Sequence, residues 1–387
     1  MTEICPKDKC TGCGACISSC VHSAIKWQID DEGFKYPIID NAKCIDCAVC
    51  VRRCPNNKEY EPEEFEKSVF AAYSRRWQKK GSSGGVFSAF AEYVLANGGR
   101  VYGAAFHDKL KLEQTGISTI DELVKLQGSK YSQSDTADSY NDVKTDLQAG
   151  KIVLYCGTPC QIAGLLQVVP RRLQQKLLTI DFVCHGVPSQ KAFDKMANSL
   201  QIKYGIVTEF YFRLMKYQAI APYAMAGGKT HFLKGDEYTY MDAFYKGLLF
   251  RPSCYNCQFS SIKRPADITL ADFWRLKGFK AGRKYNGVSM LILNSNKGKD
   301  YFKQICDGLY FEERSLDYAV SEQHNLREPS KRPIQRDSSA KDFLSLSLHD
   351  FGVKYYLLPN NKVKNIIRFG IKMLSLKLGF FKYLNKK

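Results

Sequence analysis

The sequence lacks the features of a membrane, exported or nucleic-acid-binding protein. None of its apolar runs reaches the roughly 18 residues that a membrane-spanning helix needs. The opening MTEICPKDKC does not resemble a signal peptide, so we expect a cytoplasmic protein in a reducing compartment. Its basic residues are not interleaved with aromatic residues in a recognisable RNA- or DNA-binding motif, and we therefore expect no nucleic-acid partner.

Cysteine, by contrast, is abundant, with 15 in 387 residues. Two runs share the spacing C-x-x-C-x-x-C-x-x-x-C and are separated by 23 residues: Cys10, Cys13, Cys16 and Cys20, then Cys44, Cys47, Cys50 and Cys54. This duplicated spacing is typical of a bacterial-type ferredoxin with two [4Fe–4S] clusters. A tight loop can wrap only three corners of a cubane, so each cluster takes its fourth ligand from the other run. The predicted ligand sets are Cys10, Cys13, Cys16 with Cys54, and Cys44, Cys47, Cys50 with Cys20.

Structural zinc sites and a disulfide framework are the alternatives to this prediction. Zinc prefers paired C-x-x-C knuckles or Cys/His mixtures, and disulfides require an oxidising compartment. The first run departs from the ferredoxin pattern in one respect, because Val21 rather than proline follows its last cysteine. The formal charge of +18 counts every cysteine as neutral, and each oxidised cluster with its thiolates carries about −2, so the loaded protein is less basic than its sequence.

The rest of the chain predicts an α+β protein in three parts. A ferredoxin fold (1–60) precedes an α/β domain (69–326), and a basic linker and amphipathic helix (327–387) follow. In the α/β domain short β-branched runs alternate with amphipathic ones. We expect strands at 100–106, 151–156, 177–183, 209–213, 268–271 and 288–293, and helices at 86–97, 140–148, 189–203 and 299–308. The polar segment REPSKRPIQRDSSAKD (327–342) is expected to be an exposed connection.

More cysteines follow two of the predicted strands. Cys160 and Cys184 each come after a buried strand and before a helix, and ligands in open α/β sheets bind outside the carboxyl ends of strands. With Cys254 and Cys257 of a C-x-x-C loop they supply four thiolates, enough for a third cluster. A zinc site or unliganded core cysteines are the alternatives.

Two glycine- and serine-rich loops are candidate anion sites. GSSGGV (81–86) precedes an apolar helix, where free backbone N–H groups suit a pyrophosphate, although it is neither a Walker A loop nor a G-x-G-x-x-G fingerprint. GSKYSQS (128–134) could bind a phosphate or a ring edge. A glycine-rich hinge and an ordinary solvated turn are the respective alternatives.

Six segments in this order carry a family resemblance: GSSGGVFSAF (81–90), GSKYSQS (128–134), GTPCQIAGL (157–165), DFVCHGVPS (181–189), RPSCYNCQF (251–259) and RPADITLADFW (264–274). Over about residues 69–310 the chain resembles the beta-subunit family of the deazaflavin (factor 420) hydrogenases and dehydrogenases. That family also contains the 7-hydroxymethyl chlorophyll a reductases. The added ferredoxin part is similar to a bacterial branch often linked to surface-polysaccharide synthesis.

The resemblance implies an enzyme, a flavoprotein with FAD next to an iron–sulfur cluster. It assigns the flavin contacts to three loops: Ser82, Ser83, Gly84 and Gly85; Lys130, Tyr131 and Ser134; Thr158, Pro159 and Gln161. It assigns a third [4Fe–4S] cluster to Cys160, Cys184, Cys254 and Cys257. Cys156 is then a strand-end spare, and Cys5 and Cys306 are structural.

These assignments predict an iron–sulfur flavin-dependent oxidoreductase. Clusters exchange single electrons whereas most organic substrates accept a hydride, and a flavin can do both. The expected route runs from a redox partner protein or subunit through the clusters and FAD to a small-molecule substrate or deazaflavin, or in reverse. An electron-transfer adaptor without its own substrate site is the alternative. We also expect an oligomer.

His185 is the candidate acid–base residue, because it follows Cys184 at a strand end beside the expected flavin. A histidine that only donates to a backbone carbonyl is the alternative. Asp267 and Asp272 could orient Arg264 or a flavin ribose, although structural salt bridges are the commoner outcome.

The last 26 residues contain eight Lys/Arg and no acidic residue. Apolar residues recur there at 363, 366, 367, 370, 371, 374, 378 and 381, the spacing of an amphipathic helix. Such a helix can lie on an anionic membrane surface, giving a peripheral membrane contact, or it can pack onto the α/β domain.

Overall fold

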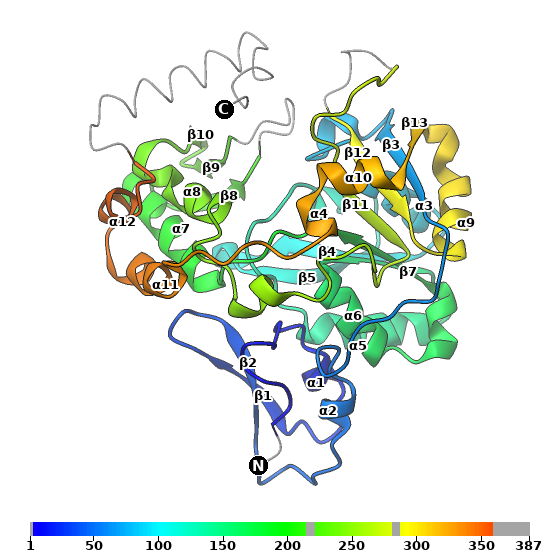
Figure 1. The fold of residues 1–387 in the computed structure, drawn as a ribbon, viewed down its shortest axis with the longest axis horizontal. Helices are drawn as coiled ribbons and strands as arrows, with labels where there is room; N and C mark the ends of the chain where they lie inside the picture. Colours follow the sequence, from blue (N-terminus) through cyan, green and yellow to red (C-terminus); the bar gives the residue numbers. More distant parts are fainter. Residues whose placement is uncertain (1–2, 214–220, 281–286, 359–387) are drawn as a thin grey trace.

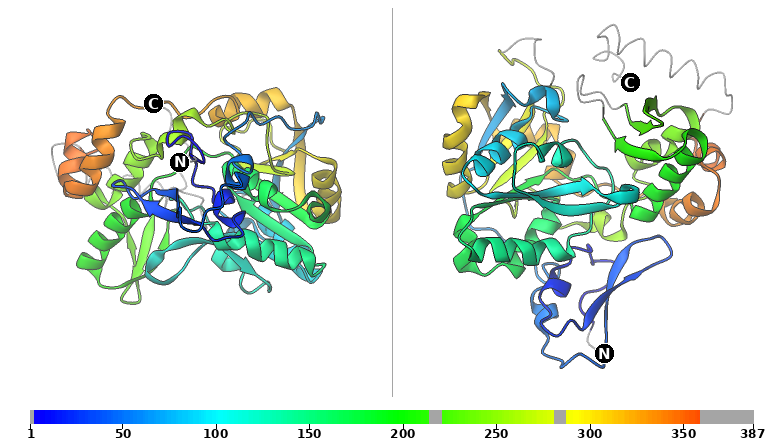
Figure 2. Two further views of the ribbon diagram at one scale, coloured as in Figure 1. Left: turned by 90° about the horizontal axis from the view of Figure 1, so that it is seen from below. Right: turned by 180° about the vertical axis from the view of Figure 1, so that it is seen from behind.

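The computed structural model describes residues 3–213, 221–280 and 287–358, which form three parts (Figure 1). A small N-terminal module lies at the bottom of the view in Figure 1, below a large central sheet and next to two of the helices that cover it. A second lobe of helices with a small sheet stands beside that central sheet (Figure 2). The predicted C-terminal amphipathic helix lies outside the described residues.

The central sheet has eight strands in the order β13 (Leu309–Arg314), β3 (Ser68–Ser74), β12 (Ser289–Leu293), β11 (Ile268–Asp272), β7 (Leu177–Phe182), β6 (Val153–Gly157), β4 (Arg100–Phe106) and β5 (Leu112–Ile117). The middle strands β11, β7, β6 and β4 are parallel, and the outer strands are antiparallel. Both faces of the parallel centre are covered, which is why its strands are nearly continuous apolar runs.

Helices cover the two faces of this sheet. On one face lie α3 (Val86–Ala96), α4 (Leu123–Leu126) and α9 (Asn296–Ile305); on the other lie α5 (Ala137–Gln148) and α6 (Pro159–Val168), with α10 (Leu316–Glu322) over the antiparallel strands. Successive residues of a strand serve opposite faces, so Leu154 packs with Phe90 of α3 while Tyr155 packs with Tyr140 of α5. The carboxyl ends of β6 and β7 therefore lie side by side, as the strand-end cysteines require.

The N-terminal module is a β1–β2 hairpin (Ile25–Ile29 and Lys35–Ile39) with two short helices, α1 (Ala15–Ser18) and α2 (Val49–Arg52). Each helix starts after the second cysteine of its run and contains the third cysteine. The residue before each helix is left-handed, Gly14 with φ 80° and Ala48 with φ 53°. The two runs thus share a backbone turn as well as a spacing.

The second lobe consists of β8 (Val207–Tyr211), β9 (Tyr223–Ala226), β10 (Lys229–Phe232), α7 (Gln190–Tyr204), α8 (Thr239–Tyr245), α11 (Arg336–Ser345) and α12 (Leu348–Lys354). Its core is rich in aromatic residues, with Phe193, Phe212 and Tyr240 packed against Phe343 and Phe351 of the last two helices.

The expectation that residues 327–342 form an exposed connection is wrong for α11. Arg336, Ser339 and Phe343 of this helix are fully buried. The polar side chains are satisfied inside the protein, because Arg336 pairs with Glu32 and Ser339 donates to the Leu248 carbonyl. Polar composition therefore concealed a packed helix.

All six predicted strands and all four predicted helices have counterparts, offset by at most a few residues. The strand at Arg100–Phe106 is confirmed at both ends, and the predicted strand 209–213 begins two residues earlier. No helix within the described ranges is long and apolar enough to cross a membrane.

Candidate functional site

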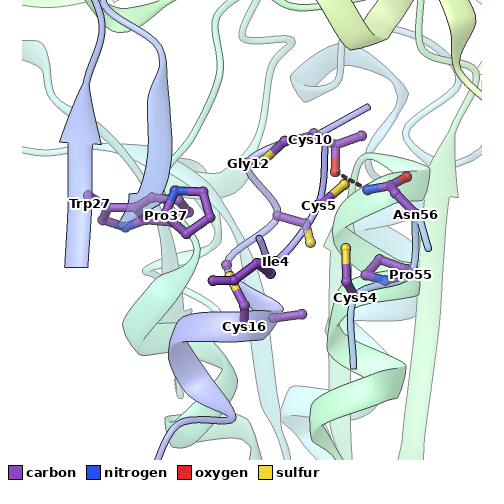
Figure 3. Close-up of a pocket in the computed structure, with 14 residues that line it drawn as sticks. Ile4, Cys5, Cys10, Gly12, Cys16, Trp27, Pro37, Cys54, Pro55 and Asn56 are labelled. Carbon is purple, nitrogen blue, oxygen red and sulfur yellow. Dashed lines mark hydrogen bonds between the residues drawn. The ribbon is translucent and has the colours of Figure 1, made fainter. Parts of the chain in front are cut away.

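The structure gathers the first predicted ligand set around one cavity of the N-terminal module. Cys10, Cys13, Cys16 and Cys54 line it, and Cys5 joins them (Figure 3). Burial raises the pKa of Cys13 to about 12, whereas a hydrogen bond with the Cys5 thiol lowers the pKa of Cys54 to about 7. The cysteines of both runs meet here, as the crossed arrangement predicts.

Two buried polar atoms near this cavity suit an anionic, sulfur-rich group. The indole Nε1 of Trp27, which lines the cavity, and the Oη of Tyr36, which packs against Cys10, have no hydrogen-bond partner within the described protein. Buried donors without partners are costly, and N–H or O–H donors tune the potential of iron–sulfur clusters. The residues present therefore fit a [4Fe–4S] cluster.

The second predicted set surrounds a separate cavity at the outer end of the module. Cys20, Cys44, Cys47 and Cys50 line it together with Val21 and Ile45. Cys47 is exposed, and Val21 and Ile45 are 90% and 64% exposed. This set faces solvent through an apolar rim.

Neither cavity resembles a zinc site. Among residues 3–213, 221–280 and 287–358, no group of three or more His, Cys, Asp or Glu side chains converges closely enough for a single metal ion. The sulfur atoms surround open volumes instead, an arrangement that suits a multi-iron cluster better than one zinc ion.

The third predicted set comes together at the carboxyl edge of the parallel strands. Cys160 stands in the first turn of α6 after β6, Cys184 follows β7, and Cys254 and Cys257 come from a 3₁₀ turn (Pro252–Asn256) and its end. Burial and, to a smaller extent, the neighbouring thiols of the set raise the pKa of Cys160 to about 11 and of Cys184 to about 12. The four cysteines are thus half-buried neighbours at this edge of the sheet.

A buried ion pair lies beside this third set. Arg264 is paired with Asp181 at 2.9 Å, both are buried, and Arg264 also donates to the Phe259 and Phe182 carbonyls. The positive charge of Arg264 acts to lower the pKa of Cys184 and Cys257, against the effect of burial. It thereby favours thiolates, the form that binds iron.

The first and third sets are joined through α6. A Cβ on Gly164 would lie 3.0 Å from the Cys13 sulfur, so Cys13 packs directly on the helix whose first turn carries Cys160. Thr136 before α5 donates to the Cys13 carbonyl at 2.7 Å. Glycine at position 164 is therefore what allows this close approach.

The three loops assigned to the flavin are occupied by contacts within the chain. Ser83 donates to the Val288 carbonyl, the Gly84 amide donates to Ser289, and Ser82 accepts a hydrogen bond from the Ser129 amide. Side chains added at Gly84 or Gly85 would collide with backbone of β3, β12 or residue 77. These glycines serve close packing, and the Ser82–Ser129 bond brings the first two loops together.

The second and third loops are also linked. Lys130 donates to the carbonyls of Lys125, Leu126 and Gln127 at the end of α4, and burial lowers its pKa to about 7. Ser134 accepts from Gln161, whose side chain closes a capping box with Thr158 ahead of Pro159. The ring of Tyr131 packs edge-on against Phe212 and at a tilt against Phe244 in the second lobe.

His185 is exposed, and its Nδ1 lies 2.6 Å from the Oδ1 of Asn325. This contact leaves Nε2 available. Asp267 and Asp272 form structural ion pairs, with Lys297 and Arg213 respectively, and neither contacts Arg264, which is held by Asp181.

Two residues near the first set were not expected there from the sequence: Arg251 had no assigned role, and Cys5 was expected to be structural. Arg251 is fully buried where the module meets the α/β domain, and it opens the RPSCYNCQF motif. An arginine directly before a cysteine motif was the available signal. Cys5 has no partner at a regular spacing, so only the folded chain places it beside Cys54.

Comparison with known proteins agrees with this organisation. Residues 69–140 and 150–318 match the N-terminal and C-terminal regions of the coenzyme F420 hydrogenase/dehydrogenase beta subunit, and residues 9–58 match the 4Fe–4S dicluster domain.

Two relatives come from Methanocaldococcus jannaschii. A coenzyme F420-dependent sulfite reductase is 29% identical over 183 residues, 46% of this chain and 28% of that protein. An uncharacterized ferredoxin is 39% identical over 51 residues, 13% of this chain and 65% of that protein. The chain therefore spans less than two thirds of either relative.

A structure of the F420-reducing [NiFe] hydrogenase complex from Methanosarcina barkeri superimposes with a TM-score of 0.44 at 17% identity, covering 76% of this chain and 94% of that one. The family matches lie on the α/β domain and on the paired cysteine runs. The chain belongs to the coenzyme F420 hydrogenase/dehydrogenase beta-subunit family and carries a 4Fe–4S dicluster domain ahead of the family region.

Proposed function

We propose that this chain is an iron–sulfur oxidoreductase that relays single electrons between an external redox carrier protein and an organic coenzyme that takes up a hydride. The proposed cluster ligands are the three cysteine sets described above. Bound [4Fe–4S] clusters supply one-electron exchange. The protein's own contribution is to hold the sets in a row, exclude water between them and shape the electrostatics of each.

The contact between Cys13 and Gly164 is the observation that carries this proposal. Cys160 and Gly164 are four residues apart on α6, a rise of about 6 Å along the helix. A cluster held by the first set and one held by the third would therefore be close neighbours across a dry interface. A module that served only as a fold-stabilising metal site would not need this proximity.

The exposure of the sets supports an order. The second set includes exposed Cys47, the cysteines of the first set are buried, and those of the third set are half-buried at the carboxyl edge of the parallel strands. We propose that an external carrier docks at the second set and that electrons pass inward through the first set to the third. The opposite direction uses the same order in reverse.

For the organic partner we propose coenzyme F420, the coenzyme named in the family description and in one relative. A hydride comprises two electrons and one proton, so a converter between clusters and coenzyme is needed, and FAD is our proposal for it. Of the first loop expected to hold its pyrophosphate, the Ser83 hydroxyl and the Gly84 amide already donate within the chain, and Ser82 accepts from the Ser129 amide. His185 is the proposed proton shuttle: its Nδ1 donates to the Oδ1 of Asn325, so Nε2 of the neutral ring accepts a proton and can then pass it on.

Anaerobic purification tests the proposal. We expect about 12 irons per chain, bleaching of the iron–sulfur absorption by dithionite, and electron transfer to coenzyme F420. Cys254→Ser should remove about four irons and leave the module's clusters reducible, whereas Cys306→Ser, outside all three sets, should remove none.

Iron and flavin analysis separate the alternatives. Constant iron after substitution of Cys160, Cys184, Cys254 and Cys257 in turn would show that these residues are not ligands. Reducible clusters without any flavin or coenzyme turnover would identify an electron-transfer adaptor that serves a separate catalytic partner.

A further inference from the structure

Arg251 stands at the junction between the N-terminal module and the α/β domain, and its side chain is fully buried. Its guanidinium donates from Nε to the Cys10 carbonyl at 2.7 Å, from Nη2 to the Lys35 carbonyl at 2.9 Å, and from Nη1 to Gln133 at 3.3 Å. Nη2 also lies 3.7 Å from the Cys10 sulfur. A single side chain of the α/β domain thus forms hydrogen bonds with the loop that carries Cys10 of the first cysteine set.

No carboxylate is among the hydrogen-bond or ion-pair partners of this guanidinium within the described residues. Its described partners are two carbonyls, an amide, one sulfur, and the rings of Tyr36 and Phe34, whose centroids lie 4.2 and 5.3 Å away. The other fully buried large arginine, Arg336, is instead paired with Glu32. A buried charge without a counter-charge costs several kcal/mol. An anion bound near Arg251 would therefore stabilise this buried guanidinium.

The cysteine loop is shaped to admit this arginine. Gly12 has φ +66°, and a Cβ there would lie 2.9 Å from both Nη1 of Arg251 and Nε2 of Gln133. The backbone of Arg251 is fixed as well, because its amide donates to Val187 and its carbonyl accepts from the Cys254 amide, each at 2.9 Å. Arg251 therefore sits between the first set and the loop of the third.

We infer that Arg251 is the buried counter-cation of a cluster bound by Cys10, Cys13, Cys16 and Cys54, and that it raises the reduction potential of that cluster above that of the solvent-facing one. This inference rests on the proposed ligand sets. One-electron reduction adds one negative charge, and a cation 3.7 Å from a ligand sulfur stabilises the reduced form. Electron transfer from the exposed second set to the buried first set is thereby energetically favourable.

The test is a potentiometric titration of the full-length, cluster-loaded protein followed by EPR. Arg251→Gln should lower the midpoint potential of one ferredoxin-module cluster and leave the other unchanged. Arg336→Gln is the matched control: it removes another buried arginine, one that ties the module to the second lobe through Glu32, and it should shift neither potential. Equal shifts in both variants, or none in Arg251→Gln, would overturn the inference.

Arg251→Lys keeps the experiment decisive if the glutamine variant loses its fold. A buried lysine gives up its proton far more readily than arginine. In this variant the potential of the same cluster should therefore fall as pH rises, while the wild-type potential stays level. A pH-independent lysine variant would refute the role of charge. Iron-free or irreducible wild-type protein would instead refute the proposed function itself.

Discussion

The two cysteine sets of the N-terminal module share a spacing and a left-handed turn before a short helix, yet they lie in opposite surroundings. The first set is covered by α6, Thr136 and Arg251, and its cysteines are almost entirely buried. The second set is rimmed by exposed Val21 and Ile45. Under the proposed function, equal ligands in unequal surroundings would give clusters of different potential, because burial, charge and hydrogen bonds set cluster potentials. The direction of electron flow between them would then depend on the docking of the module on the α/β domain.

Removing one ligand from each set should have the largest effect. Cys16→Ala and Cys50→Ala should each lose about four irons. Electrons from dithionite should still reach the third set in Cys50→Ala, because the remaining path is intact, but much more slowly in Cys16→Ala. Rapid-mixing absorbance with EPR distinguishes the clusters. Equal slowing in both variants would mean that the two sets do not differ in role.

The second largest effect is expected from a larger side chain at the place where the module packs on the α/β domain. Gly164→Val places carbon where the Cys13 sulfur now packs, and overpacking of this kind costs about 1–3 kcal/mol. We expect a lower melting temperature and slower electron transfer from the first set to the third. Gly308→Val is the control, since a Cβ there meets no neighbouring atom within 4 Å. An unchanged melting temperature in Gly164→Val would contradict the close packing.

A substitution in the exposed rim of the second set should have a smaller and more selective effect on electron transfer. Ile45→Glu should alter the free energy of unfolding by less than about 0.5 kcal/mol, because the side chain is 64% exposed. It should nevertheless slow reduction by a protein carrier while leaving reduction by dithionite unchanged. Ile334→Glu, at a fully exposed position in the connection before α11, should change neither rate. Identical carrier kinetics in both variants would argue against docking at the second set.

The contrast between buried and exposed groups extends to Lys130 of the α/β domain, where the smallest effect is expected. Burial lowers the pKa of Lys130 to about 7, so between that pH and about 10.4 the unfolded chain binds more protons than the folded one. The free energy of unfolding should therefore rise with pH over this window, and Lys130→Met should flatten the rise.

Urea unfolding at pH 7 and pH 9 measures this difference. The control is Lys125→Met, which removes an exposed lysine that pairs with Glu122 at the surface. Its pH dependence should match that of the wild-type protein. A Lys130→Met variant with the wild-type slope would show that Lys130 remains charged in the folded state.

Periodicity found the parallel centre of the sheet and the neighbouring β12 but not the outer strands β3, β5 and β13. β6 and β7 are apolar runs bounded by loops, and both appeared at the predicted places. β3, with the sequence SVFAAYS, and β13, with LYFEER, lack a strong pattern of their own. They form because β3 pairs with the edge of β12, and β13 pairs with the other edge of β3. This pairing depends on tertiary contacts, which cannot be seen in the local sequence.

The flavin contacts assigned to the loops stay a prediction, because the same loop residues also make contacts within the chain. Serines and glycines at a helix start suit an anion, but the same residues suit close backbone packing. In the folded chain Ser83 and Gly84 are bound to β12 and the residue before it. Composition could not separate the two uses, because the competing partners lie about 205 residues away in the sequence.

The sequence by itself determined the grouping of the cysteines. Ligand geometry depends on short, fixed spacings, and the crossed pairing of the two runs follows from what one tight loop can reach. Only the tertiary structure decided which set is buried, that Cys13 rests on the helix of Cys160, and that Arg251 reaches Cys10 from 241 residues away. Burial and electrostatic surroundings arise from segments distant in the chain, so they exist only once the module and the α/β domain have packed together.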